Sequence, residues 1–195
     1  MSSGISKLFD ARHLDVARFA AEQGELTGAL ALADLSRLTD SVATEALASE
    51  APVMIDWSVR GQMRRDPGLD DGIARPALWL RAQTRLPLLC QRCLHPAWMA
   101  VTVHRSFLFA TDEAQAARLD GSAEDDVLAL SRKFDLYRLI EDELLLALPL
   151  APRHDVCPQP LPQSARSPDF AAADAERPHP FASLAALRPT DPHKD

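Results

Sequence analysis

The sequence predicts an α+β fold, in which one strong C-terminal helix and one N-terminal helix pack on a small, mostly antiparallel β-sheet. Residues 78–85 and 100–108 alternate apolar and polar side chains around a short polar turn, which is typical of a β-hairpin. Residues 136–148 repeat apolar residues at helical spacing. Residues 158–180 are rich in proline, serine, aspartate and alanine, which predicts a disordered C-terminal tail.

The composition is that of a single globular domain. The chain has 195 residues, of which 47% are hydrophobic and 25% charged. We expect one domain over residues 1–157 and a flexible tail over residues 158–195 that ends in a short amphipathic segment. Neither a long apolar run nor a secretory signal is visible, so we expect a cytoplasmic protein. The net charge of −7 argues against binding nucleic acid over the whole surface.

The first half of the chain predicts one helix and two strands before the hairpin. Asp10 is a candidate N-cap for a helix that ends at Gly24. Residues 25–32 alternate loosely and predict a short strand, followed by a helical turn at residues 34–38. Residues 52–59 predict the next strand. Residues 61–75 contain several glycine, proline and aspartate residues, which predicts a loop.

The second half follows the hairpin. Residues 112–126 are acidic and alanine-rich and predict an exposed connection, and residues 127–130 predict a short strand. Asp135 then caps the strongest helix, which Pro149 ends. Residues 180–187 predict a two-turn helix that docks its phenylalanine and leucine side chains.

Four residues with metal-binding side chains follow two of these elements. Cys90 and Cys93 lie at the hairpin tip, while His154 and Cys157 come just after the strong helix. Because zinc favours four sulfur or imidazole ligands in a tetrahedron, these four residues are candidate zinc ligands. The alternative is a pair of ordinary reduced thiols that order a turn, so zinc is possible but not required. Redox catalysis is disfavoured, since reactive Cys-x-x-Cys pairs lie at helix N-termini and this pair lies between strands.

Several segments in order resemble a known family. They are residues 89–94, residues 135–149, His154-Asp155 followed by Cys157, residues 180–182 with Leu184 and Leu187, and residues 9–38. In this order and spacing they resemble the YceD family of bacterial and plastid proteins, over nearly the whole chain apart from the tail linker. The resemblance implies a role in accumulation of the large-subunit (23S) ribosomal RNA. It implies no catalytic activity, so we expect a protein that is not an enzyme.

Arginines cluster in a stretch without acidic residues. From Gly72 to Thr111 there is no aspartate or glutamate, and five arginines lie there. Such a stretch predicts a local basic surface for phosphates, and tryptophans beside it could stack on bases. The nucleic-acid-binding candidates are Arg81, Arg85, Arg92, Arg105 and Trp79, with Trp98 as a second aromatic. The simpler interpretation is that these arginines are solvated and the tryptophans belong to the core.

Two kinds of partner remain open from the sequence. The first is large-subunit ribosomal RNA or an assembly intermediate of that subunit. The second is a basic ribosomal protein or an rRNA-processing protein, for which this acidic chain would serve as an adaptor.

Glu143 interrupts the apolar side of the strong helix. At about 100° per residue it falls among Leu136, Leu139 and Leu144, whereas Glu141 and Asp142 fall on the opposite side. Because a buried unpaired charge is costly, we expect a structural ion pair between Glu143 and one of the hairpin arginines. A carboxylate kept for a ligand or for proton transfer is the alternative.

Overall fold

The computed structural model describes residues 9–47, 51–69, 71–159 and 181. The chain divides into two compact units, Met1–Cys157 and Pro158–Asp195, and every helix and strand given below lies in the first. The predicted tail linker and the predicted helix at residues 180–187 lie outside the described residues, apart from Pro158, Gln159 and Phe181.

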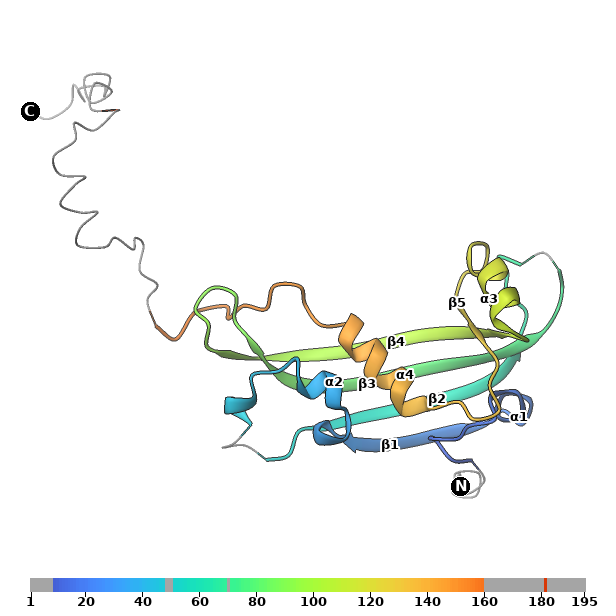
Figure 1. Cartoon of the computed structure of the whole chain (residues 1–195), viewed down its shortest axis with the longest axis horizontal. Helices are drawn as coiled ribbons and strands as arrows, with labels where there is room; N and C mark the ends of the chain where they lie inside the picture. Colours follow the sequence, from blue (N-terminus) through green and yellow to red (C-terminus); the bar gives the residue numbers. More distant parts are fainter. Residues whose placement is uncertain (1–8, 48–50, 70, 160–180, 182–195) are drawn as a thin grey trace, which may run out of the picture. The chain divides into compact units, whose positions relative to one another are not determined.

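Five strands form one sheet whose spatial order is the order of the sequence (Figure 1). They are β1 (Glu25–Ala31), β2 (Met54–Arg64), β3 (Arg75–Leu89), β4 (Pro96–Ala110) and β5 (Asp126–Ala129). The first four pair antiparallel with their neighbours, and β5 pairs parallel with β4. This arrangement confirms the predicted α+β class with its mostly antiparallel sheet.

Four α-helices accompany the sheet in the described part of the chain. They are α1 (Val16–Ala21), α2 (Ser36–Thr39), α3 (Glu113–Asp120) and α4 (Leu136–Leu146), with short 3₁₀ turns η2 (Leu32–Asp34) and η3 (Thr44–Ala46). As predicted, Asp135 caps the longest of them, α4, because its carboxylate accepts from the backbone N–H groups of Tyr137 and Arg138.

The main core lies between one face of the sheet and the helices α1, α2 and α4. Every second residue of the central strands points into it, as the period of a strand requires. Fully buried members include Phe19, Ile55, Leu80, Leu136 and Ile140. Burying each such side chain contributes about 1.5–3 kcal/mol.

Two boundaries in the first half of the chain differ from the prediction. The first helix is capped by Asp15 rather than Asp10, whose carboxylate instead accepts from the backbone N–H of Arg12 in the preceding turn. Strand β2 continues to Arg64, past the predicted end at residue 59. Gly61 does not break it, because the missing side chain leaves the space that the Phe19 ring fills.

The predicted exposed connection at residues 112–126 is wrong in part, because it contains α3. Asp112 caps this helix by accepting from the backbone N–H of Gln115, and alanine-rich sequence has high helix propensity. Ala116 of α3 is buried against Ala77 and Leu108, which point to the sheet face opposite the main core. A small second core therefore covers one end of that face.

The rest of this second face is polar and uncovered. Within the described residues, three cross-strand rows cross it from β1 to β4, as the registers show. The rows are Glu25–Arg60–Trp79–Ser106, Thr27–Ser58–Arg81–His104 and Ala29–Asp56–Gln83–Thr102. We call the residues of these three rows, together with Arg85, the open face.

The edge of the sheet at β4 is only partly paired. Strand β5 pairs with Phe107–Ala110 alone, which leaves the earlier part of β4 at an edge.

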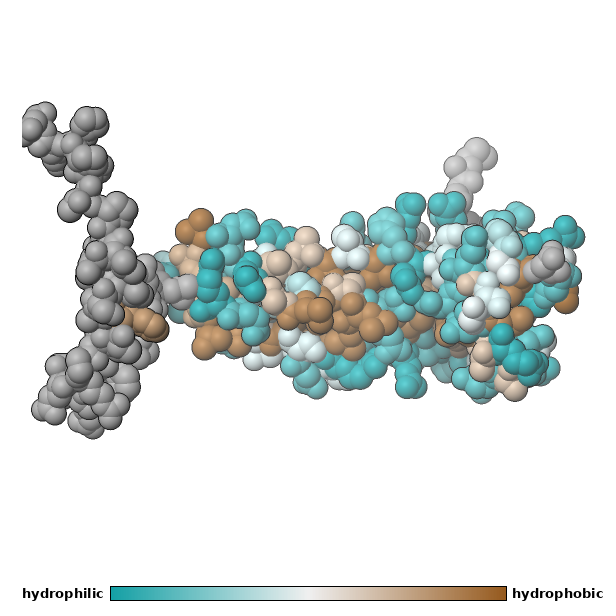
Figure 2. Space-filling view, turned by 90° about the horizontal axis from the view of Figure 1, so that it is seen from above, coloured by the Kyte–Doolittle hydropathy of each residue, from teal (hydrophilic) through white to brown (hydrophobic). Residues whose placement is uncertain are grey.

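Figure 2 looks at the molecule from above the view of Figure 1 and shows an apolar band between polar areas. No helix in the described part of the chain is both long enough and apolar enough to span a membrane.

Candidate metal centre and nucleic-acid interface

The turn between β3 and β4 folds the hairpin tip into a compact loop. Cys90 donates its backbone N–H to the His95 carbonyl (3.0 Å) and accepts from the Leu94 N–H (2.9 Å). The Gln91 N–H then donates to the Pro152 carbonyl (2.8 Å). That last bond brings the segment after α4 against the tip, although the two are far apart in sequence.

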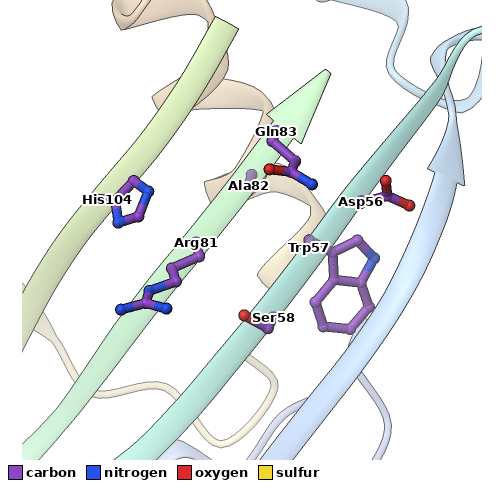
Figure 3. A pocket seen from close by; sticks show the side chains of 7 residues that line it. All are labelled: Asp56, Trp57, Ser58, Arg81, Ala82, Gln83 and His104. Atoms are coloured by element: carbon purple, nitrogen blue, oxygen red, sulfur yellow. The ribbon is translucent and has the colours of Figure 1, made fainter.

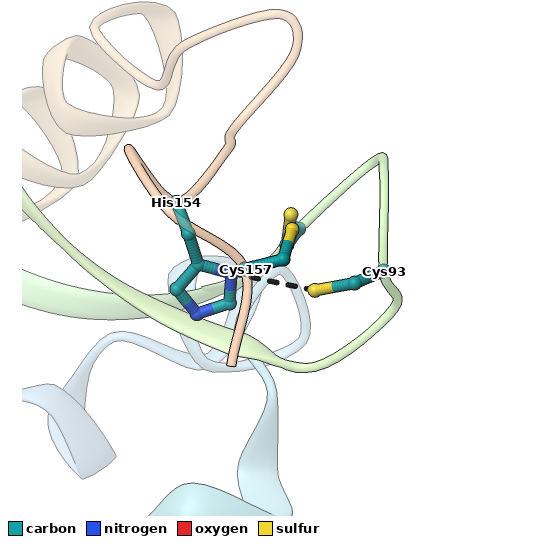
Figure 4. Close-up of side chains that lie close together, drawn as sticks. Cys93, His154 and Cys157 are labelled. Carbon is teal, nitrogen blue, oxygen red and sulfur yellow. Dashed lines mark hydrogen bonds between the residues drawn. The ribbon is translucent and has the colours of Figure 1, made fainter. Parts of the chain in front are cut away.

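Four side chains converge where these segments meet. The sulfurs of Cys90, Cys93 and Cys157 and a ring nitrogen of His154 all lie within 4.8 Å of one another. His154 Nδ1 and Cys93 Sγ are 3.4 Å apart (Figure 4). Zinc bonds of about 2.0–2.3 Å keep tetrahedral ligands roughly 4 Å apart or closer, so this spacing fits a zinc ion with little adjustment. We call the four residues the Cys₃His cluster.

A hydrogen bond sets the ring orientation of His154. Its Nε2 lies 2.9 Å from the Pro96 carbonyl oxygen, which can only accept, so Nε2 carries the hydrogen. The lone pair of Nδ1 is then free and directed toward the three sulfurs. Metal-binding histidines are usually held in this way through their second nitrogen.

The backbone around Cys90 favours its thiolate. Burial alone would raise the pKa of this thiol, but the backbone N–H groups of Cys93, His154 and Arg92 donate toward it and lower the pKa to about 5. Burial raises the pKa of the neighbouring Cys93. Metal ions bind thiolates, so these surroundings of Cys90 suit a metal ligand.

The donor set is characteristic of a structural site. Three sulfurs and one imidazole complete a tetrahedron and leave no position for water or substrate, whereas catalytic zinc keeps one position open. The residues present therefore fit a zinc ion that fastens the segment at residues 152–157 to the hairpin tip.

The predicted nucleic-acid-binding residues do not lie together. Trp79, Arg81 and Arg85 belong to the open face, where Arg81 stands between Ser58 and His104 in register. Ser58, Arg81 and His104 line a hollow of ≈ 290 Å³, together with Asp56 and Gln83 (Figure 3). A second hollow next to it is lined by Arg60, Trp79 and again Arg81.

Arg81 and Arg85 are exposed and carry unbalanced charge. Among the residues that the structure describes, neither has an acidic side chain within ion-pair distance. Arg60 lies 3.9 Å from Glu25, which offsets its charge. The two tryptophans are half-buried, and the guanidinium of Arg64 lies 5.5 Å from the Trp79 ring centroid. Trp98 pairs in register with Pro87 nearer the hairpin tip.

Arg105 points to the other side of the sheet. It pairs in register with Leu80 of the main core, binds Asp126, and lies with its Nε 3.4 Å from Glu143 Oε2. Burial raises the pKa of Glu143, and the charge of Arg105 offsets part of that rise. Arg92, at the hairpin tip, faces the Cys₃His cluster.

The helix wheel misplaced Glu141, which was expected in solvent and is only 7% exposed. Its carboxylate accepts from Arg37 Nε (3.0 Å) and Nη2 (2.7 Å), and also from the backbone N–H of Arg37 (2.8 Å). These bonds join α2 to α4. Burial opposes ionisation, but the bonds from Arg37 and Leu38 outweigh it and lower the pKa of Glu141. Nothing in the spacing of Arg37 pointed to this pair, since α2 is a single short turn.

Comparison with models of known protein families identifies a family for this chain. A family model described as "Large ribosomal RNA subunit accumulation protein YceD" matches residues 78–188, which is more than half of the chain. The matched span begins in β3 and includes the hairpin, α4 and all four residues of the Cys₃His cluster. No solved structure matches the chain.

Proposed function

The chain belongs to the YceD family, as its sequence predicted, and on that membership we propose that it acts in the cytoplasm as a non-catalytic factor in the accumulation of large-subunit ribosomal RNA. The factor works by binding. Its RNA contact is the open face, and a structural zinc ion in the Cys₃His cluster keeps the hairpin tip in shape.

The observation that carries the RNA contact is the pair of unbalanced arginines on an uncovered sheet. Arg81 and Arg85 lie two strand positions apart on each side of Gln83, in a stretch of chain without acidic residues. Serine, threonine, glutamine and histidine side chains around them can donate to phosphate and base edges. The chain as a whole is acidic, so RNA is repelled from most other surfaces and is directed to this face.

Aromatic stacking supports the same assignment. Sheet-based RNA-binding modules stack unpaired bases on aromatic side chains of the exposed sheet face. Trp79 lines the hollow beside Arg81, with Arg64 over its ring. We therefore favour single-stranded segments of the ribosomal RNA over duplex.

Salt titration of RNA binding tests the proposal. The affinity of the full chain for fragments of large-subunit RNA is measured against salt, beside the double variant Arg81→Gln/Arg85→Gln. The logarithm of the association constant falls as the logarithm of the salt concentration rises, and each lost phosphate contact makes this slope less steep by about 0.7 for single strands. The slope of the double variant should therefore be less steep by roughly 1.4. Arg138→Gln is the matched control, because Arg138 is exposed on α4, away from the open face. Equal slopes for all three proteins would reject RNA binding by this face.

A protein partner is the second candidate. Near the end of α4, a hollow is lined by Glu143, Arg105 and Leu146. Leu146 is 77% exposed, and Asp142 directly precedes Glu143 in the sequence. An apolar side chain beside carboxylates suits a basic ribosomal protein. If the chain is an adaptor, a basic ribosomal protein should co-purify from cells with the unaltered chain and not with the Leu146→Ser variant. The RNA affinity of that variant in vitro should be unchanged.

A further inference from the structure

Arg92 lies in the turn between Cys90 and Cys93 and reaches across to the other half of the Cys₃His cluster. Its Nε donates to Cys157 Sγ (3.1 Å), and its Nη2 donates to the His154 carbonyl (2.9 Å). The same Nη2 lies 3.5 Å from the Asp155 carbonyl oxygen. One guanidinium from the hairpin therefore contacts both ligand residues that the segment after α4 supplies.

The charge of a loaded cluster explains why a cation is suited to this position. A zinc ion carries two positive charges, three thiolates carry three negative charges, and a neutral imidazole adds none. The loaded cluster would thus carry one net negative charge at a partly buried place, where a charge without a partner is costly. A guanidinium that donates to a ligand sulfur balances that charge. Because the guanidinium is planar and has several N–H donors, it can at the same time donate to the backbone carbonyl of a second ligand residue.

We propose that Arg92 is a positioning residue of the metal centre, serving as counter-ion to Cys157 and as a clamp on the backbone of His154. The sequence suggested that Arg92 contacts RNA, because it is one of the hairpin arginines. The proposed role replaces that interpretation. This inference rests on the zinc part of the proposed function and is independent of the RNA part.

The geometry also argues against a second role in RNA binding. The Nε and Nη2 donors already have partners within the fold, whereas Arg81 and Arg85 have none of this kind in the described part of the chain. A phosphate that took both donors would have to displace Cys157 and His154 from Arg92. We therefore expect its loss to be felt by the metal ion.

Competition for zinc is the test. The full-length chain is loaded with zinc and titrated with a chromophoric chelator, beside Arg92→Gln, Arg92→Lys and the control Arg85→Gln. Changing an outer-shell partner of a zinc ligand typically lowers metal affinity about 10–100-fold, and we expect that loss for Arg92→Gln. Arg92→Lys should recover part of it, because lysine restores the charge without the fork. Arg85→Gln should bind zinc as the unaltered protein does.

A cobalt readout separates positioning from general stability. With Co²⁺ in place of zinc, the thiolate absorption reports how many sulfurs bind, and Arg92→Gln should weaken the contribution of Cys157. Relative to the unaltered protein, Arg92→Gln should lower the melting temperature less in the metal-free form than in the zinc-loaded form. Equal losses in both forms would reject the counter-ion role and leave a merely structural contact.

The other outcomes are also decisive. Unchanged zinc affinity in Arg92→Gln, with zinc bound by the unaltered protein, overturns this inference alone. If RNA affinity falls in that variant while zinc affinity does not, Arg92 is an RNA contact and the inference is wrong. Failure of the unaltered protein to bind zinc overturns both the inference and the proposed zinc site, and does not affect the RNA part.

Discussion

At the scale of single residues, two glutamates of α4 have opposite surroundings. Glu141 accepts several charge-assisted hydrogen bonds from Arg37 and from the backbone at the start of α2. Glu143 is nearly as buried, but its nearest cation is Arg105 Nε at 3.4 Å. The sequence favoured Glu143 as the carboxylate that stabilises the fold, and the hydrogen bonds favour Glu141.

We expect Glu141→Ala to lower the stability of the protein most. Hydrogen bonds to a charged group contribute about 1.5–3 kcal/mol, and this variant also leaves two backbone N–H groups without their acceptor. Asp142→Ala should cost less, because Asp142 is exposed and its contact with Arg37 is at the surface. Urea denaturation of the three alanine variants measures the order, and a largest loss in Glu143→Ala would restore the sequence-based expectation.

The two glutamates should also respond oppositely to pH. The folded pKa of Glu141 is lowered, so its contribution is present above the unfolded value of about 4.3 and is lost as the pH falls through the folded pKa. The folded pKa of Glu143 is raised, so its contribution is present at low pH and is lost as the pH rises through the folded pKa.

Two glutamine variants test this difference in urea between pH 3 and pH 7. The stability gap between the unaltered protein and Glu141→Gln should shrink toward low pH. For Glu143→Gln, the unaltered protein should gain relative stability toward low pH. Parallel curves for the two variants would contradict the environments assigned here.

Sequence spacing predicted the four members of the Cys₃His cluster better than it predicted the ionic contacts. A Cys-x-x-Cys turn and a His-x-x-Cys segment are local patterns, and the strong helix between them could be expected to return to the sheet. The contact between Arg37 and Glu141 joins residues 104 positions apart. No periodic pattern records such a pair, because it depends on how α2 and α4 meet on the sheet.

At the scale of elements, the packing of α1 on β2 depends on the absence of a side chain. A Cβ at Gly61 would lie 2.5 Å from Phe19 Cδ1 and 3.0 Å from the Phe19 carbonyl oxygen. The Gly61 N–H also donates to the Gly24 carbonyl (2.9 Å), which joins β2 to the turn between α1 and β1. A residue that usually predicts a loop is here a packing requirement inside a strand.

Gly61→Ala should therefore destabilise the protein. Overpacking a well-filled core typically costs about 1–3 kcal/mol. Gly121→Ala is the matched control, since a Cβ at Gly121 meets nothing within 4 Å and its φ of −71° suits any residue. That control should be neutral or stabilising by up to about 1 kcal/mol. Thermal melting of both variants distinguishes the packing effect from a general cost of replacing glycine.

A second prediction at this scale concerns the segment after α4. If zinc fastens it to the hairpin tip, a chelator should lower the melting temperature and speed proteolysis within residues 150–157. Cys157→Ser should mimic the chelator and make the protein indifferent to it. Unchanged cleavage and melting after chelation would show that the hydrogen bond from Gln91 to Pro152 is sufficient without metal.

At the scale of the whole sheet, the sequence predicted which residues point to which face better than it predicted what covers each face. The alternation in β3 placed Leu78 and Leu80 inside and Arg81 and Arg85 outside, as found. It did not reveal α3, because Ala116 is the one residue that this helix buries and a single buried residue produces no apolar periodicity. The position of Arg105 could have been read from the sequence, because Arg105 falls in the same alternation as Val101 and Val103 of β4 and therefore lies on the face opposite Arg81.

The sheet order has a consequence for synthesis of the chain. Strands β1 to β4 lie side by side in the order in which a ribosome releases them, so each can pair with the strand made just before it. Contacts between neighbours in sequence close with little loss of chain entropy and form early in folding. Helix α4, which completes the main core, emerges after all five strands. Until then the part of the apolar face that α4 covers is open to solvent, and this interval is when a nascent chain of this design most needs protection from aggregation.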